Sequence, residues 1–150
     1  MRNASTYILT LLLTLILQSC THNNGDIGPY FGTWKLSAIE VDGNNMDSYK
    51  GNIFWQFQAE VFCMREVLPN HDTNVCWGSW KEASDGILEL NFTHSDDSHP
   101  AGSTYYSPFI ITGLQPAVNR LDIKSKSGTR LTLSYIDSEG KSYTYRLIKW

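Results

Sequence analysis

The chain has 150 residues, and 12 Lys and Arg stand against 15 Asp and Glu, so its formal net charge at pH 7 is −3. This acidic balance, without a basic stretch, excludes the positive surface with which proteins bind nucleic acid. Hydrophobic residues make up 41% of the chain and aromatic residues 13%, which is enough for one core at this length. We therefore expect a single folded domain that does not bind nucleic acid.

The first residues have the layout of an export signal. Arg2 precedes an apolar stretch over residues 7–17, and Gln18, Ser19 and Cys20 follow it. The stretch is shorter than the roughly 20 apolar residues of a transmembrane helix and fits the 7 to 15 of a secretory signal. We predict that residues 1–19 are a cleaved signal peptide, with a retained membrane span as the alternative.

The residues around the predicted cleavage site resemble a bacterial lipoprotein signal, with Leu17 and Ser19 before Cys20. The resemblance implies that Cys20 carries acyl chains such as palmitate and becomes the mature N-terminus, on either face of the outer membrane. Each buried methylene contributes about 0.8 kcal/mol, so two acyl chains anchor a protein firmly. Ordinary cleavage, which leaves Cys20 a plain thiol, is the alternative. Residues 20–28 are small or polar and are predicted to be a tether.

The remaining chain is predicted to be all-β, because apolar residues recur at every second position and Gly, Asn, Asp, Ser or Pro stand at the breaks. Short turns between strands favour an eight-stranded antiparallel up-and-down barrel, in which no strand edge is left exposed. A β-sandwich is the alternative. The expected strands cover residues 32–41, 52–67, 75–82, 88–92, 105–112, 121–123, 131–135 and 143–147.

The alternation in the second segment, "NIFWQFQAEVFCMREV", places Ile53, Trp55, Phe57, Ala59, Val61 and Cys63 on one face, which we expect to point inward. An aromatic interior with a few hydroxyl groups suits a small apolar ligand. The alternative is that these rings only fill the core. The predicted ligand-binding residues are Trp55, Phe57, Trp80, Tyr135 and Tyr145.

Cys63 and Cys76 flank a predicted hairpin connection. If they face each other, Val61 lies opposite Gly78 and Ala59 lies opposite Trp80, so that large residues meet small ones. A disulfide is expected in an exported protein, and closing a loop of about 14 residues would stabilise the fold by roughly 3 kcal/mol. Two buried free thiols are the alternative.

Two surface features have weaker indications of function. Phe54, Phe62 and Trp77 are predicted to face outward, where they either form a docking surface for a protein partner or are covered by the long loop after Phe92. In that loop His94, Asp96, Asp97 and His99 are metal-ligand types, but a solvated loop without a rigid frame is the preferred interpretation. No metal site, cofactor or nucleophile with its base is predicted, so we expect a protein that is not an enzyme.

The stretch "PYFGTWKL" resembles the lipocalins, in which a Gly-x-Trp triplet, here Gly32 to Trp34, opens the first strand after a short turn, here residues 29–31. The chain is more similar still to the lipocalin-like domains of Bacteroidetes lipoproteins, over residues 29–150. This resemblance implies a calycin-like barrel in which a basic residue of the last strand packs over Trp34, and Arg146 is the candidate. The expected function is non-catalytic binding of a small apolar ligand. The second hypothesis is a protein-interaction or inhibitor module.

Overall fold

The computed structural model describes residues 28–84 and 86–150. The predicted signal peptide, the lipidation site Cys20 and the tether up to residue 27 lie outside the described residues. Within the described residues, no helix is long and apolar enough to cross a bilayer.

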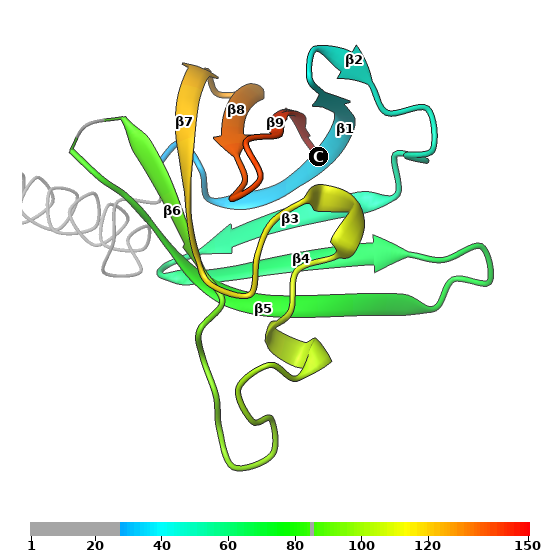
Figure 1. The fold of residues 1–150 in the computed structure, drawn as a ribbon, viewed down its shortest axis with the longest axis vertical. Helices are drawn as coiled ribbons and strands as arrows, with labels where there is room; N and C mark the ends of the chain where they lie inside the picture. Colours follow the sequence, from blue (N-terminus) through cyan, green and yellow to red (C-terminus); the bar gives the residue numbers. More distant parts are fainter. Residues whose placement is uncertain (1–27, 85) are drawn as a thin grey trace, which may run out of the picture.

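The described chain is a closed antiparallel barrel (Figure 1). Eight strands form its wall, consecutive strands pair with each other, and β1 closes the cylinder by pairing with β9. The short β2 pairs only with β1. The predicted up-and-down barrel is therefore confirmed over the alternative sandwich. The strands are β1 (Gly32–Val41), β2 (Asn44–Asn45), β3 (Ile53–Gln58), β4 (Val61–Val67), β5 (Thr73–Glu82), β6 (Ile87–Asn91), β7 (Val118–Lys126), β8 (Arg130–Ile136) and β9 (Ser142–Lys149).

The predicted single strand over residues 52–67 is wrong, because the chain reverses within it. Gln58 pairs with Val61, which leaves Ala59 and Glu60 as a two-residue hairpin turn. Ala59 has a φ of 48°, in the left-handed region that such turns require. The segment therefore forms two strands, β3 and β4.

The predicted strand over residues 105–112 is also wrong. These residues belong to a long connection between β6 and β7 that contains two 3₁₀ turns, η1 (Thr104–Tyr106) and η2 (Ile110–Thr112). Figure 1 shows this connection leaving β6, folding back at η1 and reaching η2 before β7 begins. The two errors cancel in the strand count, which is why eight strands were expected.

The connection between β6 and β7 closes one end of the barrel. Thr112 and Leu114 are buried, and the hydroxyl of Tyr145 donates a hydrogen bond of 2.6 Å to the carbonyl of Thr112. Burial raises the pKa of the Tyr145 hydroxyl, so this group stays protonated as a donor. Residues 109–114 thus act as a plug that one buried hydrogen bond ties to β9.

The other end is closed by the turn before β1. Tyr30 is buried, and its carbonyl accepts a hydrogen bond of 2.7 Å from the indole N–H of Trp34. The cation over the Trp34 ring is Lys149, whose Nζ lies 4.5 Å from the ring centroid. The prediction for Arg146 is wrong, because this residue faces outward on β9 and pairs with Glu40 at 2.7 Å.

The predicted disulfide is also wrong, because Cys63 and Cys76 are both free. Cys63 lies opposite Trp77, whereas Cys76 lies opposite Met64, so the register differs by one residue from the predicted one. The β4–β5 hairpin sets this register, so the two thiols lie on opposite faces of the sheet: Cys63 faces outward, while Cys76 faces the core. Burial raises the pKa of both thiols, that of Cys76 to about 12.

Candidate functional site

The five predicted ligand-binding residues point into the barrel or line its end. Trp55, Phe57 and Tyr145 are fully buried, Tyr135 is 9% exposed, and Trp80 is partly buried. The ring of Trp55 lies 5.3 Å from that of Tyr145 and Phe57 lies 5.2 Å from Trp80, so aromatic side chains occupy the centre of the cylinder. The inward orientation is as expected, and ligand binding by these residues stays a prediction.

Two of these residues retain unused donors. Within the described chain, the indole N–H groups of Trp55 and Trp80 are buried without a hydrogen-bond partner. A buried donor without a partner costs free energy, and water or a polar group of a ligand would satisfy it. The interior therefore has two indole donors available for hydrogen bonds, but aromatic side chains leave little space for a ligand.

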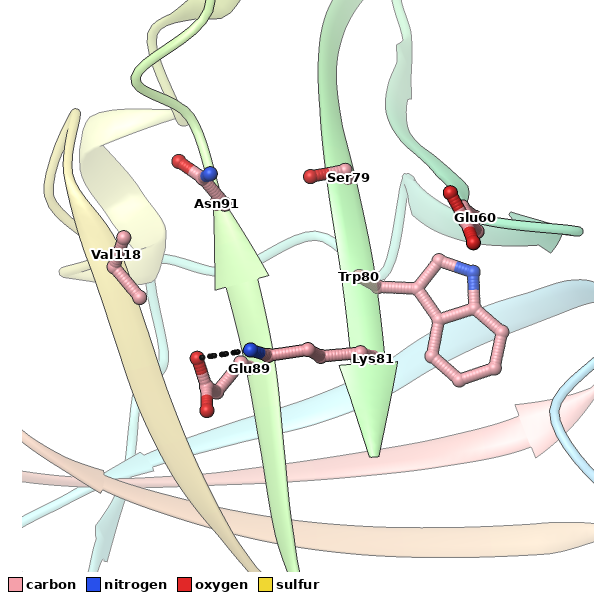
Figure 2. Close-up of a pocket in the computed structure, with 7 residues that line it drawn as sticks. All are labelled: Glu60, Ser79, Trp80, Lys81, Glu89, Asn91 and Val118. Carbon is pink, nitrogen blue, oxygen red and sulfur yellow. Dashed lines mark ion pairs between the residues drawn. The ribbon is translucent and has the colours of Figure 1, made fainter. Parts of the chain in front are cut away.

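A cavity of about 400 Å³ lies against β5, β6 and β7 (Figure 2). The side chain of Lys81 reaches across β6 to Glu89, at 3.6 Å, while Trp80 turns the other way, toward Glu60. Glu89 also pairs with Arg120, at 2.8 Å. An ion-pair network in this position makes the cavity a poor match for an apolar molecule, because binding would remove charged groups from water.

A larger cavity, of about 850 Å³, lies between the β4–β5 hairpin and the connection after β6. We call it the groove. Its lining combines apolar and polar residues, which is the composition of many small-molecule sites. The apolar lining is Val75, Tyr105, Pro108, Phe109, Ile110 and Ile111, and the polar lining is Glu66, Thr73, Asn74, His99, Thr104 and Ser107.

The polar lining of the groove contains an unusual carboxylate. Glu66 accepts hydrogen bonds from the side-chain amides of Asn74, at 3.0 Å, and Asn52, at 3.4 Å. Among the described residues no cation pairs with it within 4.0 Å. The carboxylate is thus held in a fixed position with acceptor capacity left over for a ligand that carries a donor group.

A hydrogen-bonded aromatic cluster holds the outer wall of the groove. The hydroxyl of Tyr106 donates to Asp96 at 2.7 Å, and the ring of His99 lies within 3.0 Å of the same carboxylate. The Tyr106 hydrogen bond is the main cause that lowers the pKa of Asp96 to about 2. His99 also stacks on Tyr105, with ring centroids 3.9 Å apart. The loop is therefore ordered by its own side chains.

Three of the four loop residues considered as metal ligands have other partners in the described chain. His99 and Asp96 contact each other, and His94 lies 3.0 Å from the hydroxyl of Ser79. No group of three or more His, Cys, Asp or Glu residues that would hold a metal occurs among residues 28–84 and 86–150.

The predicted outward-facing aromatic surface needs correction. Phe62 is fully buried inside the barrel, because the turn at Ala59 and Glu60 reverses the inward and outward positions of β4. Trp77 faces outward, and Tyr105 of the long loop stacks over it at 6.3 Å. The expectation that the loop covers Trp77 is therefore confirmed, and Phe62 and Trp77 do not share a face.

Sequence reasoning missed the groove itself. Its signal is the run Phe109, Ile110 and Ile111, three consecutive apolar residues within an otherwise polar connection. The sequence predicts that run as part of a strand. In the structure Ile110 is 96% exposed, while Phe109 and Ile111 pack against the core.

The geometry defines a small antiparallel barrel of the lipocalin type, plugged at both ends, with a groove on its outside. The profile of the lipocalin-like domain family matches residues 13–147, and the chain belongs to this family. No curated protein sequence matches the chain.

Two solved structures share the fold. A lipocalin-like protein from Bacteroides uniformis ATCC 8492 is 17% identical, with a TM-score of 0.57, over 82% of this chain and 100% of that one. An uncharacterized protein from Bacteroides eggerthii DSM 20697 is 16% identical, with a TM-score of 0.55, over 81% of this chain and 99% of that one. At these identities the similarity establishes the fold.

Proposed function

We propose that this protein binds a small, largely apolar molecule in the groove, without catalysis. The observation that carries the proposal is the groove itself, whose volume of about 850 Å³ lies within the usual range for ligand sites, about 300 to 1,000 Å³. The barrel interior, which the sequence had favoured, is filled by aromatic side chains. We therefore place the proposed binding site on the outside of the barrel and not in its interior.

The lining of the groove also restricts the chemistry of the ligand. Phe109, Ile110 and Ile111 provide an apolar wall, and burying a ligand against it is favourable by about 25 cal/mol for each Å² of apolar surface. Glu66, which also lines the groove, has acceptor capacity but no cation within 4.0 Å among the described residues. The ligand class is an apolar body with one hydroxyl, amide or amine donor.

The experiment is a fluorescence titration with N-phenyl-1-naphthylamine, a neutral apolar probe with one N–H donor. Val75→Glu places a negative charge in the apolar lining. Arg65 is the cross-strand neighbour of Val75, and its positive charge should allow the sheet to tolerate the new carboxylate. We expect probe affinity to fall about tenfold or more, because the probe would then desolvate a carboxylate.

The matched control for this titration is Val118→Glu, which makes the same change at a 49% exposed valine that lines the other cavity. Its affinity should equal that of the wild type. Equal affinity in wild type and Val75→Glu would refute the groove as the site. A loss in Val118→Glu alone would assign binding to the cavity of Figure 2.

We further propose that the protein is an outer-membrane lipoprotein anchored through Cys20. The support is the sequence before this cysteine, namely an apolar stretch, Leu17 and Ser19. Cells fed alkyne-labelled palmitate should yield labelled protein, and Cys20→Ser should abolish the label. A wild-type protein without label, with an intact mass that corresponds to a plain thiol at Cys20, would contradict the anchor.

A further inference from the structure

A patch of aromatic, aliphatic and basic side chains occupies the outside of β8, β9, β1 and β3. Strand register places Arg130 beside Ile148, Ile148 beside Lys35, and Lys35 beside Phe54. The C-terminal Trp150 completes the group, and we call these five residues the basic–aromatic patch. Laterally paired residues point to the same side of a sheet, so the five form one continuous surface.

Trp150 is the centre of this patch. Its backbone N–H donates to the carbonyl of Thr33 at 3.0 Å, which fixes the chain end beside β1 (Figure 1). Its ring meets Phe54 edge to face, with centroids 5.3 Å apart, and the Nζ of Lys35 lies 5.5 Å from the ring. Even so, Trp150 is 74% exposed and Ile148 is 45% exposed. Trp150 and Ile148 are thus exposed to solvent, although backbone and ring contacts hold Trp150 in a fixed position.

The two charged residues of the patch, Lys35 and Arg130, are both positive. The ion pairs found within residues 28–84 and 86–150 do not include Lys35 or Arg130. The cross-strand row that begins at Arg130 continues past Phe54 to Arg65, and no carboxylate stands in it. Cations that lack acidic partners, around an exposed Trp ring, fit the headgroup region of an anionic bilayer.

The patch also lies next to the start of the folded domain, which is close in the sequence to the predicted lipid anchor at Cys20. Gly28 lies eight positions after Cys20, and an extended chain of eight residues spans at most about 28 Å. Phe31, three residues after Gly28, is 40% exposed, and its carbonyl accepts a hydrogen bond from Lys149, which immediately precedes Trp150. The start of the folded domain is therefore next to the patch.

We propose that the basic–aromatic patch rests on the anionic surface of the bilayer that holds Cys20, a proposal that depends on the lipid anchor proposed above. In the same cross-strand row, Val75 of the groove lies two strands from Phe54, about 10 Å away at the usual strand spacing. Docking through the patch therefore brings the groove close to the membrane, from which an apolar ligand can enter it.

The test uses the acylated protein in phosphatidylethanolamine–phosphatidylglycerol vesicles with brominated acyl chains, which quench nearby tryptophans. We expect quenching of the wild type and its loss in Trp150→Phe. The double variant Lys35→Glu/Arg130→Glu keeps the ring but should dock at least about 25-fold more weakly, since the loss of each cation near an anionic surface costs about fivefold and the new carboxylates add repulsion. Lys141→Glu, which changes one charge in the β8–β9 turn, should quench like the wild type.

Flotation of the protein with the vesicles reports the anchor separately. If wild type and double variant float equally and are quenched equally, Lys35 and Arg130 do not hold the patch on the anionic surface, and the proposal fails while the anchor stands. If the wild type floats without any quenching of Trp150, the patch serves a protein partner instead of the bilayer. If the wild type does not float, both anchor and docking are overturned. The probe affinity of the groove should be the same in all patch variants.

Discussion

Replacing Trp55 with alanine is expected to lower the free energy of unfolding by about 3 to 5 kcal/mol, the usual cost of removing a large aromatic ring from a core. Trp55 is fully buried on β3 between Trp34 of β1 and Met64 of β4. Its ring also meets Phe62 edge to face at 5.5 Å. Its neighbours belong to a closed wall that cannot collapse into the vacated space. Urea unfolding followed by circular dichroism measures the loss.

The control for this substitution is Trp150→Ala, which removes the same side chain from the surface. Trp150 is 74% exposed, so the expected loss is about 1 kcal/mol or less. Equal losses in the two variants would show that the interior is not packed around Trp55, and would restore the barrel centre as a ligand site. A folded Trp55→Ala protein that binds the naphthylamine probe more strongly would indicate that the cavity created by the substitution accepts apolar molecules.

The sequence was sufficient for the all-β class, because alternation and polar breaks are local properties, and the short turns correctly favoured a barrel; the strand count agreed only because two errors cancelled. It was insufficient for the turn at Ala59 and Glu60, which has no Asn-Gly or Gly-rich signal. Ala59 takes a positive φ that alanine seldom adopts, and the pairing of the flanking strands imposes it. That one turn reversed the inward and outward positions of β4, and the errors at Phe62 and Cys63 follow from it.

The candidate site was beyond sequence reasoning for a different reason. The groove exists because a long connection folds back on β5, and contacts between residues distant in the sequence hold it there, such as Trp77 with Tyr105 and His94 with Ser79. No local pattern encodes such contacts. The Gly-x-Trp triplet correctly indicated the family, but the cation over Trp34 comes from Lys149, since β9 presents Arg146 to the solvent.

Gly113→Ala is expected to have the second large effect, because the plug leaves no room for a methyl group. A Cβ at this position would lie 2.2 Å from Cζ of Tyr143, and the residue has a φ of 71°. A left-handed conformation costs alanine about 1 to 2 kcal/mol, and overpacking adds about 1 to 3 kcal/mol. We therefore expect the free energy of unfolding to fall by about 2 to 5 kcal/mol.

Gly140→Ala separates these two contributions. Gly140 also has a positive φ, of 83°, but nothing lies within 4 Å of its added Cβ, so only the backbone cost of about 1 to 2 kcal/mol should appear. The difference between the two variants in the loss of unfolding free energy measures the cost of overpacking the plug against Tyr143. If it is near zero, the plug moves away easily despite the hydrogen bond from Tyr145 to Thr112. The barrel interior would then be open to ligands in solution, and probe binding should survive Val75→Glu.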